Sequence, residues 1–126
     1  MKKVLFALLA FSALTFSSCS KDAKINRRID GSWNVVSIDG ETMPSGSSYV
    51  MNFTKDKKTT GDGSIVVTDG GATETLAFTY SVTDEVLTFV HDGITETLKV
   101  KTYEKKKIEF VDSYSGGDEI WVLEPK

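Results

Sequence analysis

Few residues of this chain could perform catalysis or bind a metal. His91 is the only histidine and Cys19 the only cysteine, whereas a structural zinc site needs four such ligands and a nucleophile needs a positioned base. Asp92 follows His91 and precedes Gly93, and an Asp-Gly pair between alternating runs predicts a hairpin turn. We therefore expect His91 to lie at a strand end, and we expect no enzyme activity, no metal and no cofactor.

Other polar motifs also favour turns over sites. Asp-Gly pairs at 39–40, 62–63, 69–70 and 92–93 lack the dense alternating oxygen ligands of a calcium loop. Ser45-Gly46-Ser47-Ser48 is not a nucleophile elbow, because no strand–turn–helix pattern surrounds it.

Cys19 ends a segment that is typical of export. Lys2 and Lys3 precede the mostly apolar residues 4–16, a run too short for a membrane-spanning helix of about 20 residues. Phe16-Ser17-Ser18-Cys19 resembles a lipobox, with phenylalanine in place of the usual leucine. We expect residues 1–18 to be a lipoprotein signal peptide and Cys19 to carry the lipid, palmitate included. The alternative, an ordinary signal peptide, would leave an odd thiol in an exported protein.

Residues 19–30 are polar and of mixed charge, which predicts a tether between the lipid and a domain of residues 31–126. Ile25 and Ile29 are four residues apart, which suits one helical turn packed on the end of the domain. Ser20-Lys21-Asp22 resembles the signals that send some Gram-negative lipoproteins to the cell surface, although a solvated linker explains it as well. The expected location is the outer membrane of the cell envelope, with surface exposure left open.

Charge excludes one class of partner. Loss of residues 1–18 would remove Lys2 and Lys3, leaving thirteen bases against eighteen acids and a net charge of −5. Nucleic-acid binding depends on lysine and arginine neutralising phosphates, so we expect none. Membrane contact is expected through the lipid and not through a basic patch.

The sequence of residues 31–126 predicts a series of β-hairpins. Apolar residues alternate and turn signals recur about every 8–12 residues, which is typical of an all-β sandwich or barrel. Gly61 and Gly63 within one strand indicate a bend. Eight strands leave two exposed edges unless the first and last pair, so we predict an antiparallel up-and-down barrel, with a two-sheet sandwich as the alternative. The eight strands are expected at 31–39, 49–54, 59–68, 76–82, 86–90, 95–103, 108–111 and 119–123.

Three segments carry a family resemblance. Gly31-Ser32-Trp33 resembles the lipocalin Gly-x-Trp at the start of the first strand, and the loop 40–48 lies where lipocalins carry a lid. The ending Trp121-Val122-Leu123-Glu124-Pro125-Lys126 is similar to that of small lipocalin-like domains of Gram-negative lipoproteins, which are calycin-type barrels. Two features depart from the pattern: no arginine follows Arg28 to cover the tryptophan, and the domain is short, which implies a small cavity or none.

An inward aromatic stripe is the feature that could serve function. We expect Trp33 to plug the closed end of the barrel under Ile25 or Ile29, and the opposite rim to bind a small hydrophobic or amphipathic ligand without catalysis. The alternative is a protein-interaction module, an envelope-assembly partner or a hydrolase inhibitor, acting through loop 40–48. The predicted ligand-binding residues are Tyr49, Met51, Phe53, Phe78, Tyr80 and Phe89.

Overall fold

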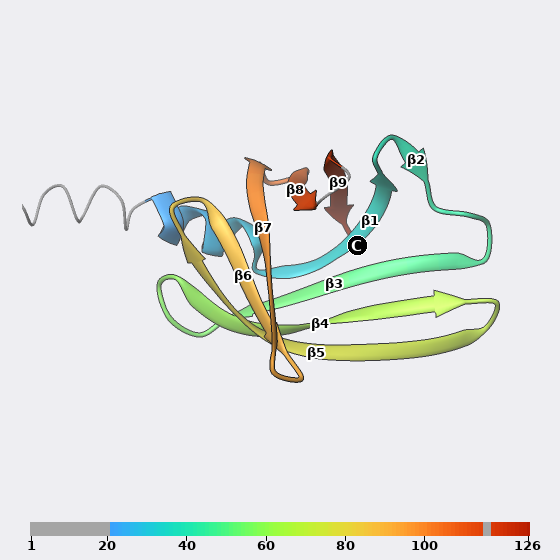
Figure 1. Cartoon of the computed structure of the whole chain (residues 1–126), viewed down its shortest axis with the longest axis horizontal. Helices are drawn as coiled ribbons and strands as arrows, with labels where there is room; N and C mark the ends of the chain where they lie inside the picture. Colours follow the sequence, from blue (N-terminus) through green and yellow to red (C-terminus); the bar gives the residue numbers. More distant parts are fainter. Residues whose placement is uncertain (1–20, 115–116) are drawn as a thin grey trace, which may run out of the picture.

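The computed structural model describes residues 21–114 and 117–126. They form one short helix, residues 21–29, and a single antiparallel sheet that curls into a barrel (Figure 1). The sheet order is β2-β1-β3-β4-β5-β6-β7-β8-β9, and β1 also pairs with β9. The strands are β1 (Gly31–Ile38), β2 (Glu41–Thr42), β3 (Ser47–Lys55), β4 (Thr60–Asp69), β5 (Ala72–Thr83), β6 (Val86–His91), β7 (Ile94–Tyr103), β8 (Ile108–Tyr114) and β9 (Gly117–Pro125).

The predicted eight-stranded up-and-down barrel is confirmed. Pairing of β1 with β9, from Trp33↔Pro125 to Ile38↔Trp121, closes the sheet, so the chain does not adopt the alternative sandwich. One strand was not predicted. β2 lies in the long connection after β1 and pairs only with the end of β1, through Ser37↔Thr42 and Ile38↔Glu41.

Alternation along the strands places one set of side chains inside the barrel. Tyr80 lies opposite Phe89, and Leu87 lies opposite Leu98, so apolar residues meet across neighbouring strands. The buried core comprises Ile25, Ile29, Trp33, Val35, Met51, Phe53, Phe78, Tyr80, Val82, Leu87, Phe89, Leu98, Val100, Ile108, Phe110 and Leu123.

The two glycines inside β4 make room for aromatic rings. A Cβ atom at Gly63 would lie 2.0 Å from the Asn52 carbonyl oxygen and 2.9 Å from the Phe78 ring. A Cβ atom at Gly61 would lie 2.5 Å from the Tyr80 hydroxyl. Side chains larger than hydrogen do not fit at these positions, and the strand can bend there over the barrel interior.

The segment before β1 differs from the expected tether with a single helical turn. Residues 21–29 form a helix that packs into one mouth of the barrel, where Ile25, Asn26 and Ile29 are fully buried. Its composition is polar because only one face is covered, and that face carries the two isoleucines four residues apart. These residues are therefore part of the core.

The helix makes the two ends of the barrel different. We call the plugged end the part formed by residues 21–31, 55–60, 83–86, 103–108 and 124–126, which surround the helix (Figure 1). We call the open end the opposite part, formed by residues 38–47, 69–74, 91–96, 112–114 and 117–119.

Candidate ligand pocket at the open end

The sheet splits at the open end. β1 pairs with β3 only through Gly31–Asn34, opposite Val50–Phe53. It pairs with β9 on both sides of the bulge between Val35 and Ser37, and with β2 after the bulge. The first three residues of β3 therefore pair with β4 alone. The β1–β2 turn is held by the Asp39 N–H, which donates to the Ile120 carbonyl at 2.7 Å. A gap in the pairing thus opens between β2 and the start of β3.

A hollow of about 460 Å³ lies at this gap. This volume falls in the range of small-molecule pockets, roughly 300–1,000 Å³. Three parts of the chain form its wall: the β1–β2 hairpin, the connection after β2, and the parts of β3, β4 and β9 that lie at the open end. The lining residues are Ile38, Asp39, Glu41, Thr42, Met43, Pro44, Ser47, Tyr49, Val67, Asp69 and Glu119.

The pocket has an apolar base. Ile38, Met43 and Tyr49 are partly buried and pack against the core. The Tyr49 ring also packs against Trp121, with ring centroids 6.3 Å apart at a tilt of 52°. Aromatic pairs in this geometry are rigid, amphipathic surfaces. A flat or aliphatic group of a ligand would find its contacts here.

The rim of the pocket is acidic. Four carboxylates line it, and no lysine or arginine does among the described residues. Two of these carboxylates are oriented by neighbours: Asp69 accepts a hydrogen bond from the Ser47 hydroxyl at 3.1 Å, and Glu119 accepts one from the Trp121 indole N–H at 3.0 Å. The rim therefore favours polar or cationic groups over anionic ones.

The acidic character continues across the mouth of the barrel. Burial, with the nearby charges of Glu119 and Glu96, raises the pKa of Asp112 above its usual value. His91, only 14 % exposed in its side chain, lies 2.7 Å from a Glu96 carboxylate oxygen through its Nε2. His91 is thus at a strand end, as expected, with an acidic partner that the sequence did not reveal.

Only one of the six predicted ligand-binding residues lines the pocket, Tyr49. The other five are between 1 % and 6 % exposed and are packed in the core. Phe53 is central to them: its ring makes edge contacts with the rings of Phe78 and Tyr80 at 5.8 Å and 5.5 Å. The packed residues are Met51, Phe53, Phe78, Tyr80 and Phe89.

Tyr80 belongs to the plugged end. Its hydroxyl donates to Asn26 Oδ1 at 2.6 Å, while the Asn26 amide nitrogen donates to the carbonyls of Lys57, Lys58 and Thr60 at 2.9–3.2 Å. Burial, and secondarily the charges of nearby aspartates, raises the pKa of Tyr80 far above its usual value, so the phenol stays protonated and donates. Its polar group is used by the helix.

Trp33 also lies at the plugged end. It is 4 % exposed, and its indole N–H donates to the Ile29 carbonyl at 2.8 Å. That carbonyl is one of the last in the helix and has no partner within it, so the tryptophan caps the helix while filling the barrel mouth. Trp33 therefore lies at the plugged end and is bonded to Ile29, one of the two isoleucines expected to cover it.

Sequence reasoning missed most of the pocket lining. Val67 and Asp69 alternate with outward residues at the end of β4, and their position at the rim would follow from the strand register. Loop 40–48 was singled out from the sequence and supplies Glu41, Met43 and Ser47 to the lining, but none of its residues was predicted as a ligand contact, because their placement depends on the unpredicted β2. Cys19 lies outside the described residues.

Among the described residues, no group of three or more His, Cys, Asp and Glu residues could hold a metal ion. In the same residues, no helix has the length and apolar character needed to cross a membrane.

The comparisons with known proteins support the fold of this chain and nothing about its function. No family model matches the chain, and no curated protein matches it. Among solved structures, the chain is similar to a redesigned β-barrel with a TM-score of 0.59 and 16% identity, over 82% of this chain and 96% of that chain. At this identity the likeness shows a shared barrel architecture.

Proposed function

We propose that this protein is a lipid-anchored lipoprotein of the Gram-negative cell envelope whose lipocalin-like barrel binds a small amphipathic molecule at the open end, without catalysis. The lipid would be attached at Cys19, and the outer membrane would be its location. The observation that carries the binding proposal is the split between β2 and β3, which opens onto a hollow of about 460 Å³.

The chemistry of the lining narrows the ligand. Tyr49, Met43 and Ile38 offer apolar contact, whereas Asp69 and Glu119 offer oriented hydrogen-bond acceptors. A ligand with one apolar face and one donor or cationic group would use both parts of the wall. A smaller hollow of about 280 Å³ lies at the plugged end, but basic and backbone groups line it, so the larger hollow at the open end suits an amphipathic ligand better.

A matched pair of tyrosine variants tests the pocket. The probe is N-phenyl-1-naphthylamine, a neutral dye with an aromatic face and one N–H donor. It is titrated into the unchanged protein, into Tyr49→Ser and into Tyr103→Ser. Tyr49 lines the hollow, whereas Tyr103 packs on the core at the other end. We expect about tenfold weaker dye binding for Tyr49→Ser and unchanged binding for Tyr103→Ser. Equal affinities for both variants would show that the dye binds elsewhere.

Native mass spectrometry of the protein from its own cells identifies the natural ligand. A retained small molecule that also displaces the dye supports the proposal. A protein that neither carries a molecule nor binds the dye would refute it. The anchor has a separate test, because Cys19→Ala should release the protein from the membrane fraction, and unchanged retention would contradict lipidation.

A second function is favoured by the hairpin itself. β2 and the residues after it stand beside the barrel and are exposed at Glu41, Thr42 and Pro44. Such a segment could bind a protein partner in the envelope, as a strand edge or a protruding loop does. Replacing residues 41–46 by a short glycine-containing turn would abolish partner capture under this alternative. Dye binding to the rest of the wall would persist at reduced affinity.

A further inference from the structure

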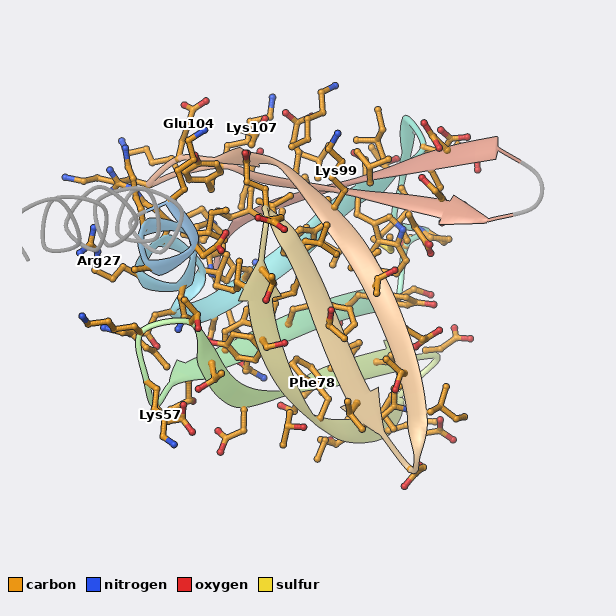
Figure 2. All side chains as sticks on the ribbon, turned by 60° about the vertical axis from the view of Figure 1, so that its left-hand side comes forward. Arg27, Lys57, Phe78, Lys99, Glu104 and Lys107 are labelled. Atoms are coloured by element: carbon orange, nitrogen blue, oxygen red, sulfur yellow. The ribbon has the colours of Figure 1, made fainter. Side chains whose placement is uncertain are left out.

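The plugged end holds most of the basic residues of the chain, whereas the sequence led us to expect membrane contact through the lipid and not through a basic patch. Its segments hold eleven lysines and arginines against seven aspartates and glutamates, which leaves an excess of four positive charges. Figure 2 shows Arg27, Lys57 and Lys107 projecting from this end, with Lys99 farther along the barrel wall. The basic residues are Lys21, Lys24, Arg27, Arg28, Lys55, Lys57, Lys58, Lys105, Lys106, Lys107 and Lys126.

The open end has the opposite character. Within its described segments there are nine acids and no lysine or arginine. The net charge of the chain therefore hides a strong polarity along the barrel axis, from a basic end to an acidic one. The acids of the open end are Asp39, Glu41, Asp69, Glu74, Asp92, Glu96, Asp112, Asp118 and Glu119.

One acid of the plugged end faces the backbone and not solvent, and a second is exposed but bonded to a backbone N–H. Asp22 is buried, and its carboxylate accepts the N–H groups of Asp84 and Glu85 at 3.1 Å each. Asp30 accepts the Lys55 N–H at 3.0 Å. In contrast, Lys24, Arg27, Lys105 and Lys106 are exposed. The surface that a partner would meet at this end is thus more positive than the residue count suggests.

The course of the chain indicates the partner. Residue 21 lies at the plugged end, and it follows the apolar run 4–16 and Cys19. One residue, Ser20, separates Cys19 from the helix, and a residue spans at most about 3.6 Å. Whichever part of residues 1–19 holds the protein to a bilayer, the basic end is the one that must face it.

We propose that the plugged end docks on an anionic phospholipid surface, so that the open end with its pocket points away from the membrane. Bases near a negatively charged bilayer are attracted within about 10 Å, and the acids of the open end are repelled from it. The proposal concerns a face of the barrel. It rests on the proposed membrane attachment through residues 1–19 and does not depend on the pocket.

Lysine footprinting tests the orientation on the protein as purified from its own envelopes. The protein is reconstituted in vesicles of phosphatidylcholine, or of an equimolar mixture with phosphatidylglycerol, and acetylated. In the anionic vesicles we expect several-fold slower acetylation of Lys24, Lys105 and Lys106, reversed by high salt, with Lys99 and Lys101 unchanged. Equal rates at the two groups, equal protection in neutral vesicles, or no binding to the anionic vesicles would overturn the proposal.

A pair of double variants supplies the charge control. Lys105→Glu with Lys106→Glu changes the plugged end, and Lys99→Glu with Lys101→Glu changes the exposed wall by the same net charge. We expect the first variant to lose the protection of Lys24 several-fold and the second to retain it. Equal loss of Lys24 protection in both variants would show that net charge alone governs binding and would overturn the proposal. Protection of Lys24 by an RNA oligonucleotide but not by the anionic vesicles would also overturn it.

Discussion

The two ends of the barrel are built from the same strands but fill their inward positions differently. At the plugged end, Asn26 makes hydrogen bonds to three backbone carbonyls and to Tyr80, and Trp33 caps the helix. At the open end, the inward positions carry carboxylates, His91 and a half-buried Tyr49–Trp121 pair around a hollow. The paired polar groups and the hollow therefore lie at opposite ends of the barrel axis.

This separation has a physical basis. Buried polar groups are stabilising only when every donor and acceptor is paired, which the helix provides at one end. At the open end, carboxylates line a hollow that protein side chains do not fill, so these groups contribute less packing to the fold and leave room for a ligand. The comparison predicts unequal effects for matched substitutions at the two ends.

The largest effect is expected at Asn26. Asn26→Ala removes the hydrogen bonds to the buried Tyr80 hydroxyl and to the carbonyls of Lys57, Lys58 and Thr60, of which the Thr60 carbonyl keeps two backbone donors. We therefore expect the free energy of unfolding to fall by about 3 kcal/mol. Denaturant unfolding measures it. Asn52→Ala is the control, because Asn52 bonds to Ser32 and Ser64 on the barrel exterior and should cost less than about 1 kcal/mol. Equal costs would contradict the role of the helix network.

The two tryptophans give the next comparison. Trp33→Phe removes a buried N–H donor to the helix carbonyl and leaves a small void, so we expect a loss of about 2 kcal/mol. Trp121→Phe removes a bond to Glu119 at a half-buried site and should cost below about 1 kcal/mol. Thermal unfolding of both variants checks the order, and a costlier Trp121→Phe would reverse our assignment of the ends.

The smallest effect has the opposite sign. Because the pKa of Asp112 is raised in the folded chain, its ionisation with increasing pH favours the unfolded state. Asp112→Asn should therefore stabilise the protein near neutral pH by up to about 0.5 kcal/mol. The gain should vanish near pH 3, where the native aspartate is protonated.

Asp118→Asn is the control for this substitution, because Asp118 is exposed and accepts a bond from the Ser113 hydroxyl. Unfolding of both variants over this pH range measures the difference. A destabilised Asp112→Asn near neutral pH would argue against charge repulsion at the open end.

The strands were predictable because their signals are local. Alternation distinguishes inward from outward positions, and Asp92 and Gly93, with φ of 48° and 75°, adopt the turn conformation that an Asp-Gly pair predicts. β2 has only two residues and no periodicity to detect. The helix was predicted only as a single turn at Ile25 and Ile29, because its buried face is a few residues within a charged segment.

The candidate site was less predictable than the fold. Alternation shows that Tyr80 and Tyr49 both point inward, but not which end of the barrel each occupies. The polar group of Tyr80 suggested a ligand contact, yet it is used by Asn26, a partner 54 residues away. Such pairings depend on register and closure, which are tertiary properties.

Amide hydrogen exchange with and without N-phenyl-1-naphthylamine tests the central claim most directly, because it reports both ends in one experiment. We predict slower exchange on dye binding at residues 38–49 and 66–69, and unchanged exchange at 21–30 and 55–60. Protection confined to the plugged end, or no change at the open end under saturating dye, would contradict the division of the barrel into a plugged end that stabilises the fold and an open end that binds a ligand.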